Sequence, residues 1–185
     1  MKVSSFSNMI ILLTISSIFF IQSIQCVPDK IDNVCQKTPH YQLCLLTLKS
    51  NLYSHRLKTN QDISEFVRVT LQVIAARAPA VLEQIRDIDA QTDHTQLKTA
   101  LDDCMIAYGK ITKEIIPQAL NYVDKRDYVG VKERANFAGS LAESCEKKCK
   151  GTTSSGVSPL GDNSQFVQNM CSIAASIASM PQSNP

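Results

Sequence analysis

The feature that most constrains this chain is the helical spacing of its apolar residues, which recurs in four successive stretches after residue 60. Apolar side chains recur there every three or four residues, which places them on one face of an α-helix and is unlike the alternation of a strand. The stretches cover residues 63–88, 97–122, 128–145 and 166–180. Only 6 Gly and 7 Pro occur in 185 residues, too few turn-forming residues for a many-stranded sandwich or barrel. The pattern therefore predicts an all-α fold.

Short polar breaks separate these stretches, at residues 89–95, 125–127 and 151–163. Four amphipathic helices with short connections pack most simply as an antiparallel up-and-down four-helix bundle. In the third stretch the stripe is made of small residues, chiefly Ala135, Ala138 and Ala142, which allows a neighbouring helix to come close. Residues 31–51 contain two further short helical pieces that are too short to fold alone.

Local signals refine the predicted helix ends. Asp62 and Glu65 have the spacing of a capping box at the start of the first long helix, and Asp127 is a candidate N-cap for the third. Pro79 and Pro117 lie inside the first and second stretches, where each removes a backbone donor and is expected to kink its helix.

The N-terminus has the pattern of a secretory signal peptide. Lys2 precedes an apolar run at residues 9–21, which is too short to span a bilayer comfortably and is followed at once by polar residues. We expect a signal peptide at residues 1–26, a helical domain at 27–180 and a short tail at 181–185. Cys26 either leaves with the signal or becomes the first mature residue. No later run of 18 apolar residues occurs, so we expect no membrane association of the mature form.

The charge balance bears on possible partners. The chain has 19 Lys and Arg against 17 Asp and Glu, a net charge of +2 that is too small and too dispersed to indicate nucleic-acid binding. The three histidines show no metal-binding spacing, and no nucleophile elbow, Walker loop or dinucleotide motif occurs. We therefore expect no catalytic residues, no cofactor and no metal.

Cysteine is the most specific signal, with 7 residues in a chain directed to an oxidising compartment. The six beyond Cys26 allow 15 pairings, and spacing alone does not choose among them. Cys35 and Cys44 flank a Thr-Pro bend that can bring two short helices within disulfide reach. Cys104 and Cys145 lie 21 and 18 residues from the turn at 125–127, so an antiparallel helix pair places them at similar heights.

Four motifs, in order along the chain, resemble the plant invertase and pectin methylesterase inhibitor family. They are VCQKTPHYQLCL at residues 34–45, LDDC at 101–104 followed by Tyr108, KRDY at 125–128 and AESCE at 142–146. Each motif alone is weak, but four with the right spacing are strong. The resemblance spans residue 35 to about residue 180. It implies a four-helix bundle preceded by an N-terminal helical hairpin.

The resemblance also bears on the cysteines. The two disulfides of the family would fall on Cys35–Cys44 and Cys104–Cys145. Cys171 matches a cysteine that the family commonly leaves unpaired in the last helix, whereas Cys149 is an addition one turn beyond Cys145. Cys149 is free to pair with Cys171 in a third disulfide across the 151–163 loop, or to compete with Cys145 for Cys104.

The function implied by the resemblance is that of a secreted inhibitor rather than an enzyme. Its expected partner is pectin methylesterase of the plant cell wall, blocked by steric occlusion of the active cleft, and its expected location is the apoplast or cell wall rather than the vacuole. Invertase is the alternative target, although the chain has KRDY at 125–128 where invertase inhibitors tend to carry Pro-Lys-Phe. A helical carrier of a small apolar ligand is the alternative of a different class. Lys125, Arg126 and Tyr128 are the candidate partner-binding residues, because charged and aromatic side chains are enriched at binding hot spots.

Overall fold

The computed structural model describes residues 30–54, 62–153 and 155–181, and every regular element among them is helical. The elements are α2 (Lys30–Cys35), α3 (Tyr41–Ser54), α4 (Ile63–Gln91), α5 (Thr95–Lys110), the π-helical η1 (Ile111–Ile115), α6 (Ile116–Asp124), α7 (Tyr128–Gly151) and α8 (Gly161–Ala178). The all-α prediction is thus confirmed. The predicted signal peptide at 1–26 and one of the three histidines, His55, lie outside the described residues. Among the described helices, none combines the length and apolarity needed to cross a membrane.

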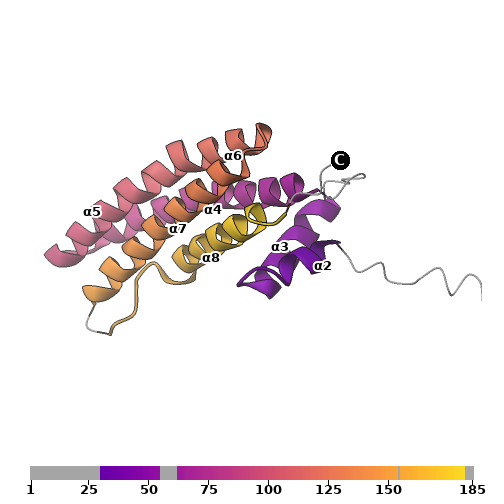
Figure 1. Cartoon of the computed structure of the whole chain (residues 1–185). Coiled ribbons are helices and arrows are strands. Elements are labelled where there is room, and N and C mark those ends of the chain that lie inside the picture. The colour runs from indigo at the N-terminus through magenta and orange to yellow at the C-terminus, as the bar shows by residue number, and fades with distance from the viewer. Residues whose placement is uncertain (1–29, 55–61, 154, 182–185) are drawn as a thin grey trace, which may run out of the picture. The chain divides into compact units, whose positions relative to one another are not determined.

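The long helices form an up-and-down bundle (Figure 1). α4 runs in one direction, the continuous α5–η1–α6 returns, α7 runs parallel to α4, and α8 returns again. α8 packs against α4 and α7, while α5 and α6 pack against the same two helices on the other side. This is the antiparallel four-helix bundle that the four stretches predict.

The predicted apolar stripes face the core. The small-residue stripe of α7 is almost completely buried from Val131 to Cys145. Because its side chains are small, α8 comes close: a Cβ added to Gly139 would lie 3.2 Å from Cys171 Cβ. α8 is buried over a wider arc than its predicted stripe, since Val167, Cys171 and Ala174 are also fully covered. The last helix is therefore the most enclosed of the four.

The helix ends agree only partly with the predictions. The Asp127 carboxylate accepts a hydrogen bond from the Gly130 N–H at 2.9 Å, which confirms Asp127 as the N-cap of α7. The capping box at Asp62 is wrong, because the Asp62 side chain accepts no backbone N–H and instead accepts the Ser64 hydroxyl at 3.2 Å. α4 and α7 also continue to Gln91 and Gly151, into segments predicted as breaks.

The two prolines are accommodated in different ways. Pro79 lies within α4, which continues through it to Gln91 as one helix. Pro117 lies in the first turn of α6, directly after the π-helical turn η1. Pro117 has no backbone N–H to donate, and in the turn before it the continuous helix changes to the wider π-helical hydrogen bonding, in which the Ile116 N–H donates to the Ile111 carbonyl. The irregularity predicted at Pro117 thus begins ahead of it, at residues 111–115.

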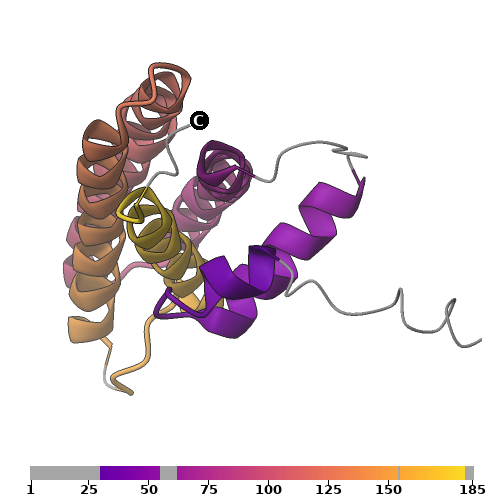
Figure 2. The ribbon, with the colours of Figure 1, turned by 45° about the vertical axis from the view of Figure 1, so that its right-hand side comes forward.

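The N-terminal hairpin consists of α2 and α3, joined by the Cys35–Cys44 disulfide with a Cα–Cα distance of 5.5 Å. The Tyr41 hydroxyl donates to the Asp32 carboxylate at 2.6 Å and adds a second link between the two helices. α3 contacts α4 and α8 (Figure 2). The Thr47 hydroxyl donates to the Met170 sulfur at 3.7 Å. Both the hairpin and its disulfide agree with the expectations from the sequence.

Candidate binding surface and cysteine cluster

The second disulfide joins α5 to α7 through Cys104 and Cys145, with a Cα–Cα distance of 5.1 Å. Both residues are buried, at 0% and 2% exposure. The two residues lie at similar distances from the 125–127 turn, at the similar height expected for an antiparallel helix pair that starts from this turn. The pairing expected from the sequence is thus present.

The third disulfide, between Cys149 and Cys171, is absent, and both residues are buried free thiols. The reason is their different height in the bundle. Cys171 lies beside Gly139, whereas Cys149 is ten residues further along α7, which corresponds to about 15 Å along a helix axis. A disulfide requires Cα atoms within about 7 Å. The prediction assumed that the loop would bring the two residues together, but α8 begins at Gly161 and carries Cys171 well away from the loop.

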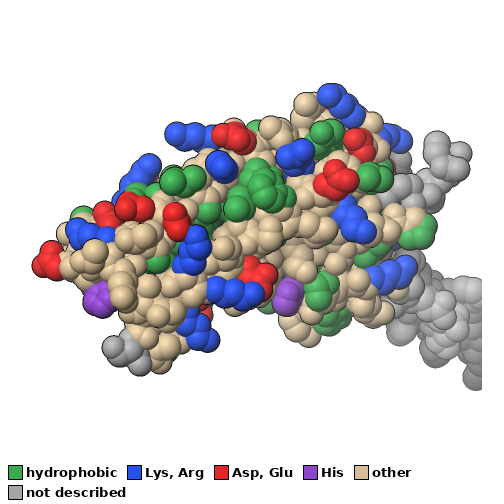
Figure 3. Space-filling model, turned by 60° about the vertical axis from the view of Figure 1, so that its left-hand side comes forward, with side chains coloured by type: hydrophobic (Ala, Val, Ile, Leu, Met, Phe, Trp, Pro, Cys, Tyr) green, Lys and Arg blue, Asp and Glu red, His purple; other side chains and the backbone are tan. Residues whose placement is uncertain are grey.

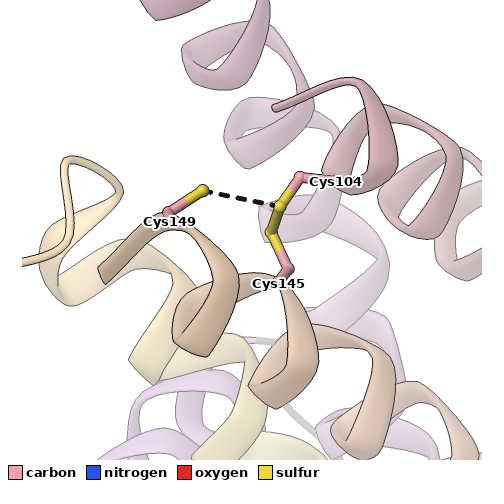
Figure 4. A group of neighbouring side chains, drawn as sticks. All are labelled: Cys104, Cys145 and Cys149. Atoms are coloured by element: carbon pink, nitrogen blue, oxygen red, sulfur yellow. Dashed lines mark hydrogen bonds between the residues drawn. A yellow bond between two sulfur atoms is a disulfide. The ribbon is translucent and has the colours of Figure 1, made fainter. Parts of the chain in front are cut away.

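Cys149 instead faces the Cys104–Cys145 disulfide. Its thiol donates to the Cys104 sulfur at an Sγ–Sγ distance of 3.6 Å (Figure 4). The three sulfurs lie within 4.8 Å of one another, the only such potential metal-binding cluster of cysteine, histidine or acidic groups in the described part of the chain. Because two of them are joined, the cluster offers one thiol rather than three ligands. Burial, reinforced by the Glu146 carboxylate, raises the pKa of the Cys149 thiol to about 11, so that it is protonated near neutral pH.

The turn between α6 and α7 has the hydrogen bonds of a Schellman motif. The Asp127 N–H donates to the Tyr122 carbonyl at 2.9 Å and the Arg126 N–H to the Val123 carbonyl at 3.0 Å. This motif needs one residue in the left-handed conformation, and Arg126 supplies it with φ of 57°. Glycine is the usual residue at such a position, because any other side chain is strained there.

The three candidate residues of this turn differ in exposure. Lys125 and Arg126 are exposed, whereas Tyr128 is half-buried and packs against the hydrophobic core. Next to them the turn is held in place by an ion pair between Arg68 of α4 and Asp124 of α6, with an N–O distance of 2.7 Å. The turn therefore presents two basic side chains on a fixed backbone.

A groove between α5 and α7 forms a second exposed feature, with a volume of about 160 Å³. Ile106 and Leu141 contribute apolar side chains to it, and Asp103 and Lys148 form an ion pair across it at 2.6 Å. Ile106 is 61% exposed. Phe137, which is 46% exposed, lies one turn before Leu141 on the same face of α7 and extends the apolar strip along the helix. Exposed apolar side chains among charges of both signs are visible in Figure 3.

Sequence reasoning missed this groove. The exposure of Phe137 could have been predicted from the sequence. Phe137 is a large aromatic residue that lies off the buried stripe formed by Ala135, Ala138 and Ala142. An aromatic residue on the outer face of a helix is a signal for binding. Ile106 gives no such signal, because its exposure depends on how far α7 stands from α5.

Two further polar side chains, those of His94 and Tyr108, have structural partners. The His94 ring nitrogen accepts the Leu97 N–H at 3.3 Å and so caps α5. The buried Tyr108 hydroxyl donates to Ser164 at 3.0 Å, and burial raises the pKa of this phenol. No assembled nucleophile, base and oxyanion site is found among the described residues. The protein is thus a disulfide-linked helical bundle with an exposed groove and an exposed basic turn as candidate contact surfaces.

Comparisons with known proteins identify the family. The chain matches the plant invertase/pectin methylesterase inhibitor family over residues 29–177, and it belongs to that family. A curated relative, pectinesterase inhibitor 1 of Arabidopsis thaliana, is 25% identical over 177 residues, which cover 94% of this chain and 92% of that protein.

Two solved structures share the fold. The crystal structure of mutant form A of a pectin methylesterase inhibitor from Arabidopsis has a TM-score of 0.68 at 21% identity, covering 83% of this chain and 99% of that one. That of a pectin methylesterase inhibitor from Arabidopsis thaliana has a TM-score of 0.59 at 21% identity, covering 86% and 100%.

Proposed function

We propose that this chain is a secreted inhibitor of pectin methylesterase. The observation that carries the proposal is membership of the inhibitor family over nearly the whole helical domain, together with a relative named as a pectinesterase inhibitor. The N-terminal pattern of a signal peptide and two disulfides support secretion to the apoplast, where the cell-wall enzyme acts.

The proposed mechanism is steric occlusion by a preorganised surface. The Cys104–Cys145 disulfide and a packed core hold the long helices in place before binding, which lowers the entropy cost of ordering an interface. The proposed contact surface combines the α5/α7 groove with the basic turn at 125–127. It offers an exposed aromatic, an exposed aliphatic and two basic side chains, residue types that commonly anchor interfaces.

The carrier alternative needs a roomy apolar interior. The α7 stripe argues against it, because Ala135, Ala138 and Ala142 are fully buried against neighbouring helices. Invertase remains a target to be tested beside pectin methylesterase, since the family includes inhibitors of both.

The proposal is tested by titrating the mature protein into a pectin methylesterase assay and an invertase assay in parallel. We expect the esterase to lose activity stoichiometrically while invertase is unaffected. Size-exclusion chromatography of the mixture should show a complex with the esterase. If neither enzyme slows at micromolar inhibitor, the proposal is wrong; if only invertase slows, its target is wrong.

The Arg126→Gly substitution is expected to raise the stability of the protein and to weaken its inhibition of the target enzyme. Glycine relieves the left-handed strain at this position, so we expect the free energy of unfolding to rise by about 1 kcal/mol. Inhibition should nevertheless weaken by about fivefold, because a charged contact with the target is lost. Urea unfolding and inhibition titrations measure the two effects. Lys125→Ala is the matched control, since it removes a neighbouring charge without changing backbone strain. Unaltered inhibition in both variants would exclude this turn from the interface.

A further inference from the structure

We propose that Cys149 is an alternative partner for Cys104, and that the disulfide between α5 and α7 exchanges between Cys104–Cys145 and Cys104–Cys149. The proposal rests on the cluster formed by these three residues and does not depend on the identity of the target enzyme. The Cys149 sulfur is in van der Waals contact with the Cys104 sulfur, at 3.6 Å. At this distance no other atom fits between the two sulfurs, and the Cys149 side chain points toward the disulfide (Figure 4).

The exchange is balanced without any external oxidant or reductant. Cys149 loses its proton and the thiolate attacks the Cys104 sulfur, forming the Cys104–Cys149 bond. The Cys104–Cys145 bond breaks, and Cys145 leaves as a thiolate that takes up one proton. One disulfide and one thiol are present before and after the step.

The position of Cys149 makes such a rearrangement feasible. It lies two residues before the end of α7, and the following Thr152 closes the helix by donating to the Cys149 carbonyl. A last helical turn adjusts more easily than a helix centre. All three sulfurs lie within 4.8 Å of one another, so the angle from Cys149 through Cys104 to Cys145 is bent rather than straight. The Cys149 side chain must therefore rotate to come into line with the Cys104–Cys145 bond that it attacks.

The exchange moves the cross-link between the helices by four residues, which is about 6 Å along α7. It also releases Cys145, which lines the groove between α5 and α7. The two disulfide isomers therefore differ at the floor of this exposed groove. Glu146 on α7 and the Tyr108 phenol on α5 interact electrostatically with the Cys149 thiol, and the Glu146 carboxylate disfavours its thiolate form. We therefore expect slow exchange near neutral pH and about tenfold faster exchange for each unit of higher pH.

The test is disulfide mapping of the intact mature protein. Samples are incubated without reductant at pH 6.5 and pH 8.5, quenched in acid, alkylated and digested under non-reducing conditions. We expect a Cys104–Cys149 peptide with alkylated Cys145 to accumulate about 100-fold faster at pH 8.5, at a rate independent of protein concentration. If only Cys104–Cys145 and alkylated Cys149 are recovered after prolonged incubation at pH 8.5, exchange does not occur and the proposal fails.

Three variants provide the controls. Cys149→Ser should abolish the new peptide, whereas Cys171→Ser should leave its rate unchanged. Refolded in a buffer of reduced and oxidised glutathione, with oxidised glutathione as the electron acceptor, Cys145→Ser should form the Cys104–Cys149 bond quantitatively while keeping the helical circular dichroism of the native chain. If the folded Cys145→Ser variant retains free thiols at both remaining positions, Cys149 is not an alternative partner, whatever the wild-type mapping shows. Should this variant fail to fold, the wild-type mapping alone decides.

Discussion

Removing the disulfide between α5 and α7, in a Cys104→Ala/Cys145→Ala variant, is expected to lower the free energy of unfolding by about 4 kcal/mol. The bond closes a loop with a sequence separation of 41, and the chain-entropy relation assigns a loop of this length about that value. Alanine at both positions leaves no thiol for Cys149 to pair with in this cluster. Urea unfolding followed by far-ultraviolet circular dichroism measures the change.

The hairpin disulfide supplies a matched control. Cys35–Cys44 closes a loop with a sequence separation of only 9, for which the same relation gives about 2.6 kcal/mol. A Cys35→Ala/Cys44→Ala variant should therefore be destabilised less than the Cys104→Ala/Cys145→Ala variant. Equal losses, or a larger loss in the hairpin variant, would show that loop length does not govern the contribution of these bonds.

Replacing Phe137 by alanine is expected to weaken inhibition of pectin methylesterase by about 30-fold, which corresponds to a hot-spot loss of about 2 kcal/mol. Phe137 is 46% exposed on α7, so the substitution removes contact area offered to a partner and little of the core. The inhibition constant is measured at several enzyme concentrations. The thermal midpoint should fall only slightly, which separates lost binding from lost folding.

Leu46→Ala is the control for this prediction. Leu46 is also an exposed large apolar residue, at 68% exposure, but it lies on α3 in the N-terminal hairpin, outside the proposed surface. Inhibition by this variant should stay within twofold of the native protein. A large loss with Leu46→Ala together with unaltered inhibition by Phe137→Ala would move the interface from the groove to the hairpin.

Much of the architecture follows from the sequence because it depends on local periodicity. Residues such as Ala135, Ala138 and Ala142 share a face in any α-helix, and burying that face requires an antiparallel neighbour when the connection is as short as 125–127. The similar height of Cys104 and Cys145 follows in the same way, since they lie 21 and 18 residues from a tight turn. Their pairing as a disulfide is what the resemblance to the inhibitor family implies.

The partner of Cys149, in contrast, does not follow from the spacing of residues along the chain. The predicted Cys149–Cys171 disulfide depends on a flexible loop over residues 151–163. In the structure Gly151 still belongs to α7 and Gly161 already begins α8. The connection is thus shorter and Cys171 lies deeper in the bundle than the sequence indicates. The capping box predicted at Asp62 is wrong because the Asp62 carboxylate has two possible donors nearby, the Glu65 N–H and the Ser64 hydroxyl. Sequence spacing does not decide between them, and in the structure the Ser64 hydroxyl is the donor.

The helices and their buried faces could be predicted from the sequence, because they depend on spacing along one chain segment. The motifs pointed to the family, and the resemblance to that family implied the two disulfides. Only the tertiary structure decided which sulfur Cys149 contacts, how exposed Ile106 and Phe137 are, and that Arg126 adopts a left-handed conformation. These features depend on the distance and rotation between packed helices. Such quantities are set by the fit of many side chains at once, and a repeat of three and four residues does not encode them.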